Sequence, residues 1–205
     1  MRTERHSQES GPIRPSRGFS WRHILIALTI FVVTAIALSA MGRIGWCKCG
    51  GTFLWSGDIV STHNSQHLFD PYSFTHVLHG IALYGIVWLF VGSRTTPATR
   101  AMIALALEAA WEVFENTSFV IERYREATIS LDYYGDSVLN SLSDIAACLV
   151  GIALAMIAPI WASMALFVIV EVTLLLWVRD SLLLNIIMLA FPLEALKEWQ
   201  MGRIH

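Results

Sequence analysis

Two long apolar segments of this chain, at residues 101–121 and 136–158, carry acidic and amide side chains at helical spacing. In each segment the polar positions recur three or four residues apart, so they share one face of a helix. Both segments are long enough to cross a bilayer, and an ionisable group that faces hydrocarbon costs at least a few kcal/mol. We therefore expect both polar faces to point into the protein, where such residues commonly mark a functional site. The polar positions are Glu108, Glu112 and Glu115 in the first segment, and Asp136, Asn140 and Asp144 in the second.

Several other apolar segments are also long enough to span a membrane, since a span needs about 20 residues at a rise of 1.5 Å per residue. A further segment at 181–197 is short and contains Pro192. It fits a tilted span, a re-entrant hairpin or an interfacial helix. The five clear spans are expected at about 23–42, 74–92, 99–121, 136–158 and 161–178.

Composition supports this class of protein. Of the 205 residues, 55% are hydrophobic, and the mean hydropathy is +0.56. Soluble domains are usually less apolar and more charged. The sequence therefore predicts an all-α integral membrane bundle of five to six transmembrane helices. The net charge is −2 and the basic residues are scattered, which excludes the basic stripe of a nucleic-acid-binding protein.

The N-terminal region is polar and rich in Pro and Ser, so residues 1–20 are expected to be a disordered cytoplasmic tail. A basic stretch before an apolar run also occurs in signal peptides. Here the apolar run is longer than usual, and no clear cleavage site follows it. We therefore expect one transmembrane domain over 21–201, with periplasmic loops at 43–73 and 122–135.

Lys and Arg placement predicts the orientation, because cytoplasmic loops are enriched in these residues. With six spans and a cytoplasmic N-terminus, nine basic residues lie inside and five outside. With five spans the count is seven against seven, so this rule gives mild support to a sixth span.

This topology predicts that three segments place polar residues at a similar depth. His76 and His79 begin the second span, Glu112 and Glu115 end the third, and the acids of 136–158 begin the fourth. All of these residues are expected within roughly 15 Å of the outer membrane boundary. Glu108, the remaining acid of the third span, is expected to lie deeper.

The expected cluster resembles the metal sites of helical bundles, where Glu and His project from facing helices. His76 and His79 are spaced i, i+3 and can face together, and the adjacent Gly80 allows close approach of another helix. Carboxylate and imidazole ligands suit Zn, Mn or Fe. A proton or solute pathway, or a purely structural polar network, remains an alternative. The predicted ligands or acid–base groups are His76, His79, Glu112, Glu115, Asp136 and Asp144.

The first outer loop holds a second set of metal-ligand residue types. Cys47 and Cys49 form a C-x-C pair, followed by His63 and His67. This pair suits a soft metal such as copper or zinc, and it is also open to oxidation. The alternative is that the polar segment around the two histidines folds over the bundle as a cap.

Three sequence blocks resemble a known family. They are C-x-C-G with HNSQHLFDPYSFTHVLHG, EAAWEVFENTSFVIERYREATISLDYYGDSVLNSLSD, and RDSLLLNIIMLAFPLEALKEWQ. Over residues 41–201 they resemble bacterial uncharacterised protein family 0314, also described as domain of unknown function 2585. The resemblance implies a multi-pass protein of the bacterial inner membrane and implies no activity.

These observations favour a polar intramembrane site that opens to the periplasm and resembles a metal-dependent hydrolase. One glutamate could activate a metal-bound water, and amphiphilic or lipid substrates from the bilayer would reach the site most easily. The alternatives are a non-enzymatic metal-handling, transport or accessory protein, which would use the Cys/His loop, and a structural scaffold.

Overall fold

The computed structural model describes residues 18–51, 53–128 and 132–202, and the expected tail lies largely outside this range. The described chain is helical, with no strand and one isolated bridge between Trp55 and Phe69. This confirms the predicted all-α bundle. Eight helices follow in order: α1 (Trp21–Ala40), α2 (Ser73–Val91), α3 (Pro97–Glu115), α4 (Ser118–Ala127), α5 (Val138–Ile157), α6 (Ile160–Val178), α7 (Leu182–Ala190) and α8 (Glu194–Met201).

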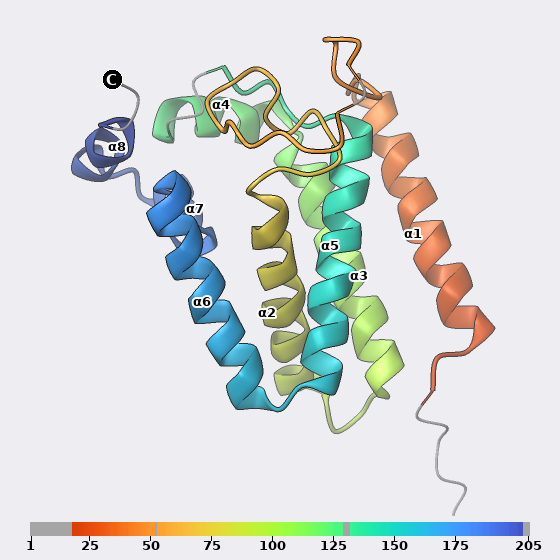
Figure 1. Ribbon diagram of the computed structural model, residues 1–205. Helices are drawn as coiled ribbons and strands as arrows, with labels where there is room; N and C mark the ends of the chain where they lie inside the picture. The colour runs from red at the N-terminus through yellow and green to blue at the C-terminus, as the bar shows by residue number, and fades with distance from the viewer. Residues whose placement is uncertain (1–17, 52, 129–131, 203–205) are drawn as a thin grey trace, which may run out of the picture.

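Five long helices run side by side as a bundle (Figure 1). Helix α2 packs against α5, α3 and α6, and α1 lies along α3 and α5. Four of them, α1, α2, α5 and α6, are long and apolar enough to cross a membrane. Helix α3 has 19 residues, as α2 does, but carries Arg100 and three glutamates. Its buried face holds Arg100, Glu108 and Glu112, so the neighbouring helices cover its charges.

Two glycines bring the backbones of α2 and α5 into direct contact. A Cβ added at Gly80 would lie 2.1 Å from the carbonyl oxygen of Cys148 and 2.9 Å from Cα of Gly151. A Cβ at Gly151 would lie 2.0 Å from the carbonyl oxygen of Val77. Small residues of this kind allow close packing of membrane helices. The expectation for Gly80 is therefore confirmed, and α5 is its partner helix.

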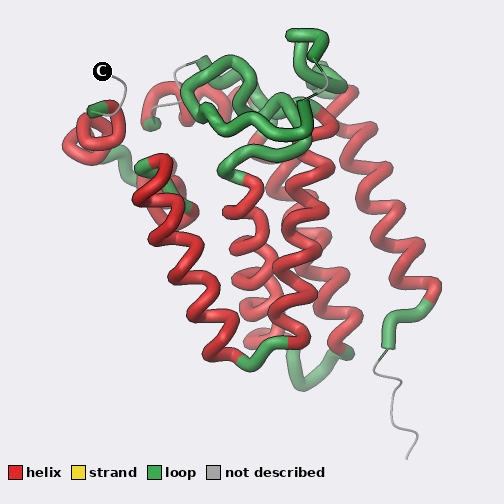
Figure 2. The backbone as a smooth tube through the Cα atoms, viewed as in Figure 1, coloured by secondary structure: helices red, strands yellow, loops and turns green. Residues whose placement is uncertain are grey.

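The two ends of the bundle differ (Figure 2). One end, here called the turn end, holds the short connections 92–96 and 158–159. The other, here called the loop end, holds the long segments 43–72 and 116–137. These segments contact each other, because Ser137 N–H donates to Ser65 O at 3.0 Å and Arg43 Nη1 donates to Tyr134 O at 2.6 Å. The two loops expected on one side of the membrane therefore lie at one end.

The predicted third span, 99–121, extends too far. Helix α3 ends at Glu115, and Thr117 begins α4 by accepting a bond from Val120 N–H. Helix α4 crosses the loop end (Figure 1), so part of the expected loop 122–135 is helical. The periodicity of the apolar positions continues through this junction. The local capping side chain decides the boundary, because it satisfies the first free N–H groups of the new helix.

The segment 181–197 forms parts of two short helices, α7 and α8, separated by residues 191–193. Helix α7 has nine residues, or about 14 Å, which is less than half the hydrocarbon thickness of about 30 Å. Arg179 Nη1 donates to Trp199 O at 2.7 Å, so α8 lies beside the end of α6. The described chain therefore returns to the loop end, and the sixth span that the Lys/Arg count mildly favoured does not form in the described residues.

Candidate functional site

Two histidines on one face of α2 begin the site. His76 and His79 lie one turn apart, with ring centroids 4.9 Å apart at an interplanar angle of 75°. His76 is buried, and the side chain of His79 is 17% exposed. Both rings point toward α3, where each contacts the carboxylate of Glu108.

Glu108 of α3 joins both imidazoles. His76 Nδ1 lies 2.6 Å from Glu108 Oε1, and His79 Nδ1 lies 3.1 Å and 3.0 Å from the two carboxylate oxygens. Glu108 is fully buried. His76, His79 and Glu108 each offer one potential ligand atom, and these three atoms lie within 4.8 Å of one another. The expected topology places Glu108 deeper than the other polar residues. In the structure it contacts both histidines, because α3 ends at Glu115 and Glu108 therefore lies only about two turns from the loop end.

Glu112 and Glu115 continue the acidic face of α3. Glu112 Oε1 lies 3.3 Å from His76 Nδ1. Glu112 is fully buried, and neither of its carboxylate oxygens has a hydrogen-bond partner among the described residues. Glu115 is half-buried and pairs with the hydroxyl of Tyr124 on α4. His76, Glu112 and Glu115 form a second group whose potential ligand atoms lie within 4.8 Å.

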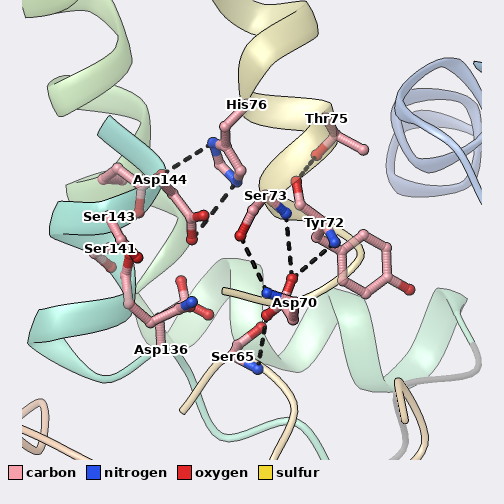
Figure 3. Close-up of polar contacts among 12 residues, drawn as sticks. Ser65, Asp70, Tyr72, Ser73, Thr75, His76, Asp136, Ser141, Ser143 and Asp144 are labelled. Carbon is pink, nitrogen blue, oxygen red and sulfur yellow. Dashed lines mark hydrogen bonds and ion pairs between the residues drawn. The ribbon is translucent and has the colours of Figure 1, made fainter. Parts of the chain in front are cut away.

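Asp144 of α5 reaches the same imidazole from the other side. Its carboxylate oxygen lies 4.0 Å from His76 Nε2, and Figure 3 shows the two side chains facing each other. One imidazole ring therefore contacts carboxylates from both α3 and α5. The remaining oxygen of Asp144 has no hydrogen-bond partner among the described residues, and neither has the side-chain amide of Asn140, one turn away.

Asp136 precedes α5 and is held by hydrogen bonds. It accepts from Asn116 Nδ2 at 3.0 Å and from the Tyr133 hydroxyl at 2.9 Å. Its own N–H donates to Asn116 Oδ1 at 2.8 Å. Asn116 also contacts Ser141 at 3.3 Å, so this amide ties the end of α3 to the start of α5. The structure thus gives Asp136 a more fixed position than Glu112.

Asp70 lies next to this network, in the loop before α2 (Figure 3). It accepts the backbone N–H groups of Ser65, Tyr72 and Ser73 at 3.0, 2.7 and 3.2 Å. Burial raises the pKa of Asp70 from 3.8 to about 6, against the opposing effect of these donors. Asp70 therefore caps the N-terminus of α2 and aligns the turn that carries His76.

Some of these residues line a cavity of about 70 Å³, and Glu108 and Glu112 lie behind its wall, in contact with His76. Its polar wall includes both histidines, Glu115, Asp136 and Asp144. Helix α7 provides an opposite wall that is mainly apolar. No Lys or Arg lines the cavity in the part of the chain that the structure describes. The α7 lining residues are Leu182, Asn185, Ile186 and Leu189.

The four predicted ligands of the first loop form a separate group at the loop end. One ligand atom from each of Cys47, Cys49, His63 and His67 lies within 4.8 Å of the others. Burial raises the pKa of the Cys47 thiol and lowers the pKa of His67, whose neighbour His63 contributes to the second shift. The structure therefore groups the predicted ligands into two clusters, one within the bundle and one outside it.

Several residues that shape the site are not apparent from the sequence pattern. Asn116, Tyr124 and Tyr133 position acids, and Trp111 places its ring edge-on to His79 at 6.2 Å. Only Trp111 gave a usable signal, because it lies on α3 between two of the acidic positions. The others come from a helix junction and a loop, whose contacts have no periodicity in sequence.

Comparison with known proteins identifies the family. A family model described as a protein of unknown function (DUF2585) matches residues 38–202. The chain is 47% identical over 171 residues to a UPF0314 protein of Paracoccus denitrificans, covering 83% of this chain and 88% of the relative. It is 44% identical over 179 residues to the UPF0314 protein R03235 of Rhizobium meliloti, a match that covers 87% of this chain and 90% of the relative. No solved structure gives a significant match. The chain therefore belongs to uncharacterised protein family 0314, as the three sequence blocks indicated.

Proposed function

We propose that the cavity is a membrane-embedded, metal-dependent hydrolytic site for an amphiphilic substrate. One observation carries this proposal: two imidazoles and a carboxylate, from His76, His79 and Glu108, present ligand atoms within 4.8 Å of one another. Two histidines and one glutamate are a common ligand set of catalytic zinc sites, which leave one coordination position for water or substrate. Such a set also suits manganese and iron.

The charge balance favours a bound cation. Glu108, Glu112, Asp136 and Asp144 are all buried around the two imidazoles. Several carboxylates close together in a poorly solvated interior repel one another unless protons or cations neutralise them. Since no described Lys or Arg lines this cavity, a divalent ion is the chemically suitable counter-charge.

Glu112 is the best placed general base. Its carboxylate lies beside His76, is fully buried, and has neither oxygen engaged by a described hydrogen-bond donor. It would accept a proton from the attacking water. An ion held by His76, His79 and Glu108 would supply Lewis-acid polarisation of the scissile carbonyl or phosphoryl group. The same proton would then pass to the leaving alcohol, which balances the hydrolysis of an ester. Glu115, Asp136 and Asp144 would orient the polar head of the substrate.

The wall formed by α7 favours an amphiphilic substrate. Leu182, Ile186 and Leu189 line the cavity opposite the acids, and Ile186 is 53% exposed. In a bilayer, this exposed apolar surface would face lipid chains. A lipid could therefore place its polar group among the acids while its chains lie along α7. Sites with mostly apolar walls and a few convergent polar groups are typical of small-molecule binding.

Two alternatives fit the geometry less well. A transport pathway would need polar groups toward the turn end, but the core below the site is apolar around Leu105, Ile145 and Ile152. A purely structural network would pair its buried polar atoms. Here both oxygens of Glu112 and both side-chain polar atoms of Asn140 have no hydrogen-bond partner among the described residues.

For orientation, we propose that the cavity opens to the periplasm of the inner membrane. Five Arg residues precede or begin α1, whereas only Arg43 and Lys48 follow it before α2. The first span usually dominates orientation, and the more basic flank stays in the cytoplasm. This places residues 1–20 inside and the loop end outside.

Hydrolysis of bacterial phospholipid vesicles tests the function. Purified full-length protein would be reconstituted with Zn²⁺ or Mn²⁺, and released phosphate esters and fatty acids would be measured. Glu112→Gln should lower the rate at least about 100-fold while metal content stays unchanged, because a general base contributes this much. Glu122→Gln, an exposed glutamate on α4, is the matched control. Equal rates for wild type and Glu112→Gln would contradict the assigned role.

A further inference from the structure

The second cluster, in the first loop, has the geometry of a closed metal site. His63 Nδ1 lies 3.5 Å from Cys47 Sγ and 3.3 Å from His67 Nε2. Cys49 Sγ lies 4.0 Å from His67 Nε2. The sulfur and nitrogen atoms thus face a common point, although the four residues come from two separate turns of the loop.

These spacings match a tetrahedral zinc ion. Zn–S bonds of about 2.3 Å and Zn–N bonds of about 2.0–2.1 Å place two nitrogens about 3.3 Å apart and a sulfur about 3.5 Å from a nitrogen. The His63–His67 and Cys47–His63 distances, 3.3 and 3.5 Å, agree with these edges. The distance from Cys49 Sγ to His67 Nε2 is 4.0 Å, which exceeds the ideal sulfur–nitrogen separation by about half an ångström.

The surrounding residues hold this geometry in place. The turn Cys47–Gly50 closes with a bond from Gly50 N–H to Cys47 O at 3.5 Å, and Gly50 has φ of +70°, which favours glycine. Cys49 N–H donates to Cys47 Sγ at 3.3 Å, a bond that stabilises a thiolate. The rings of Trp46 and Phe53 pack edge-on against the His67 ring, with ring centroids 5.6 and 5.8 Å from that of His67.

We propose that Cys47, Cys49, His63 and His67 bind one zinc ion whose role is structural. Two thiolates and two imidazoles are a tetrahedral S₂N₂ set, which favours zinc, and four protein ligands leave no position for substrate. A surface hollow lined by Lys48, Thr62 and Tyr134 beside three of the ligands gives the ion a route from solvent.

The ion fixes the segment that covers the intramembrane cavity. His63 and His67 flank Asn64 and Ser65, which line that cavity. Ser65 O accepts Ser137 N–H at 3.0 Å, so the same segment also docks onto the start of α5. Zinc binding outside the bundle therefore orders one wall of the site within it. Zinc binding by the loop does not depend on the proposed hydrolytic function. The influence of zinc on the cavity as a catalytic site does rest on that proposed function.

Metal content of the full-length protein tests the inference. Protein purified after growth with Zn²⁺ should lose one zinc equivalent per chain on Cys47→Ser/Cys49→Ser. Lys48→Ser, which lies between the two thiols, is the matched control and should retain it. Glu108→Gln should also retain this zinc, which separates the inference from the proposed function. Replacing zinc by Co²⁺ should give thiolate-to-cobalt absorption in wild type and none in the double variant. Equal zinc in wild type and the double variant would overturn the site.

Backbone hydrogen exchange tests the structural role. Removing zinc from wild type with a chelator should raise exchange over residues 61–68 at least about tenfold, and adding Zn²⁺ should restore protection. This arm needs no substitution, so misfolding of a variant does not affect it. The turn end, residues 92–96, should not change. Unchanged exchange over 61–68 after zinc is removed would overturn the structural role.

Discussion

His76 Nδ1 lies 2.6 Å from Glu108 Oε1, a contact between two buried side chains that joins α2 to α3. The same imidazole nitrogen lies 3.3 Å from Glu112, and the other nitrogen lies 4.0 Å from Asp144. One ring is therefore shared by three carboxylates from two helices. The proposed cation-dependent site requires this arrangement.

Close packing of α2 on α5 is needed to hold the two histidines. Gly80→Ala should lower the free energy of unfolding by about 2 kcal/mol or more, because the new methyl group overlaps the Cys148 carbonyl and forces the helices apart. Gly85→Ala on the same helix has no atom within 4 Å of its new Cβ and should change stability by less than about 1 kcal/mol. Thermal unfolding in detergent would compare them; equal effects would contradict the packing argument.

Glu171 should hold α7 in position. Its carboxylate, on α6, accepts Leu182 N–H at 2.9 Å and Leu183 N–H at 3.3 Å. Glu171→Ala leaves these donors unpaired, at a cost of about 1–3 kcal/mol. Hydrogen exchange should therefore increase over residues 182–190. Thr173→Ala, an exposed position on α6, should have no such effect. Equal protection of α7 in both variants would show that the carboxylate is not needed.

Stability should depend on pH through Asp180. Burial raises its pKa from 3.8 to about 6. The folded protein thus binds this proton more tightly than the unfolded chain, and the resulting stability is present below about pH 4 and lost as pH rises through 6. The shift is equivalent to about 3 kcal/mol. Asp180→Asn should make the fall of melting temperature between pH 4.5 and about 7.5 shallower. An unchanged slope would contradict this.

Topology can be checked with reporters that are active on one side of the membrane. Five long helices place the loop end and α8 on the same side, opposite residues 92–96. Fusions at Gly57 and at the C-terminus should therefore report the periplasm, and a fusion at Thr95 the cytoplasm. The same side for Gly57 and Thr95 would contradict five crossings. Cytoplasmic activity at Gly57 and periplasmic activity at Thr95 would reverse the proposed orientation alone.

Much of the fold follows from the sequence, because lipid imposes long apolar segments with inward polar faces. The five long helices match the expected spans to within a few residues, except where α3 ends at Glu115. The break before α4 depends on the cap Thr117, and the start of α7 depends on Ser181 and Glu171. Thr117 and Ser181 act locally and Glu171 acts across a tertiary contact, and none of the three alters the apolar periodicity.

The site was predictable in part for the same reason. Helical spacing and a common depth brought together His76, Glu112 and Asp144 correctly. The depth rule failed for Glu108 because α3 ends at Glu115 and not at 121, so Glu108 lies about 10 Å from the loop end of its helix and not about 20 Å. The zinc ligands were predictable as residue types, but their tetrahedral spacing arises from two turns whose relative position is set by the fold.

Metal binding within the bundle is the most direct test of the central claim. In the Cys47→Ser/Cys49→Ser background, which removes the loop site, the protein should still bind one Zn²⁺ or Mn²⁺ per chain by equilibrium dialysis. Adding His79→Gln or Glu108→Gln should abolish this binding, since each removes one of three ligands. Stoichiometric binding that persists unchanged in both of these variants, or that is absent from the folded background protein, would contradict a metal centre at His76, His79 and Glu108.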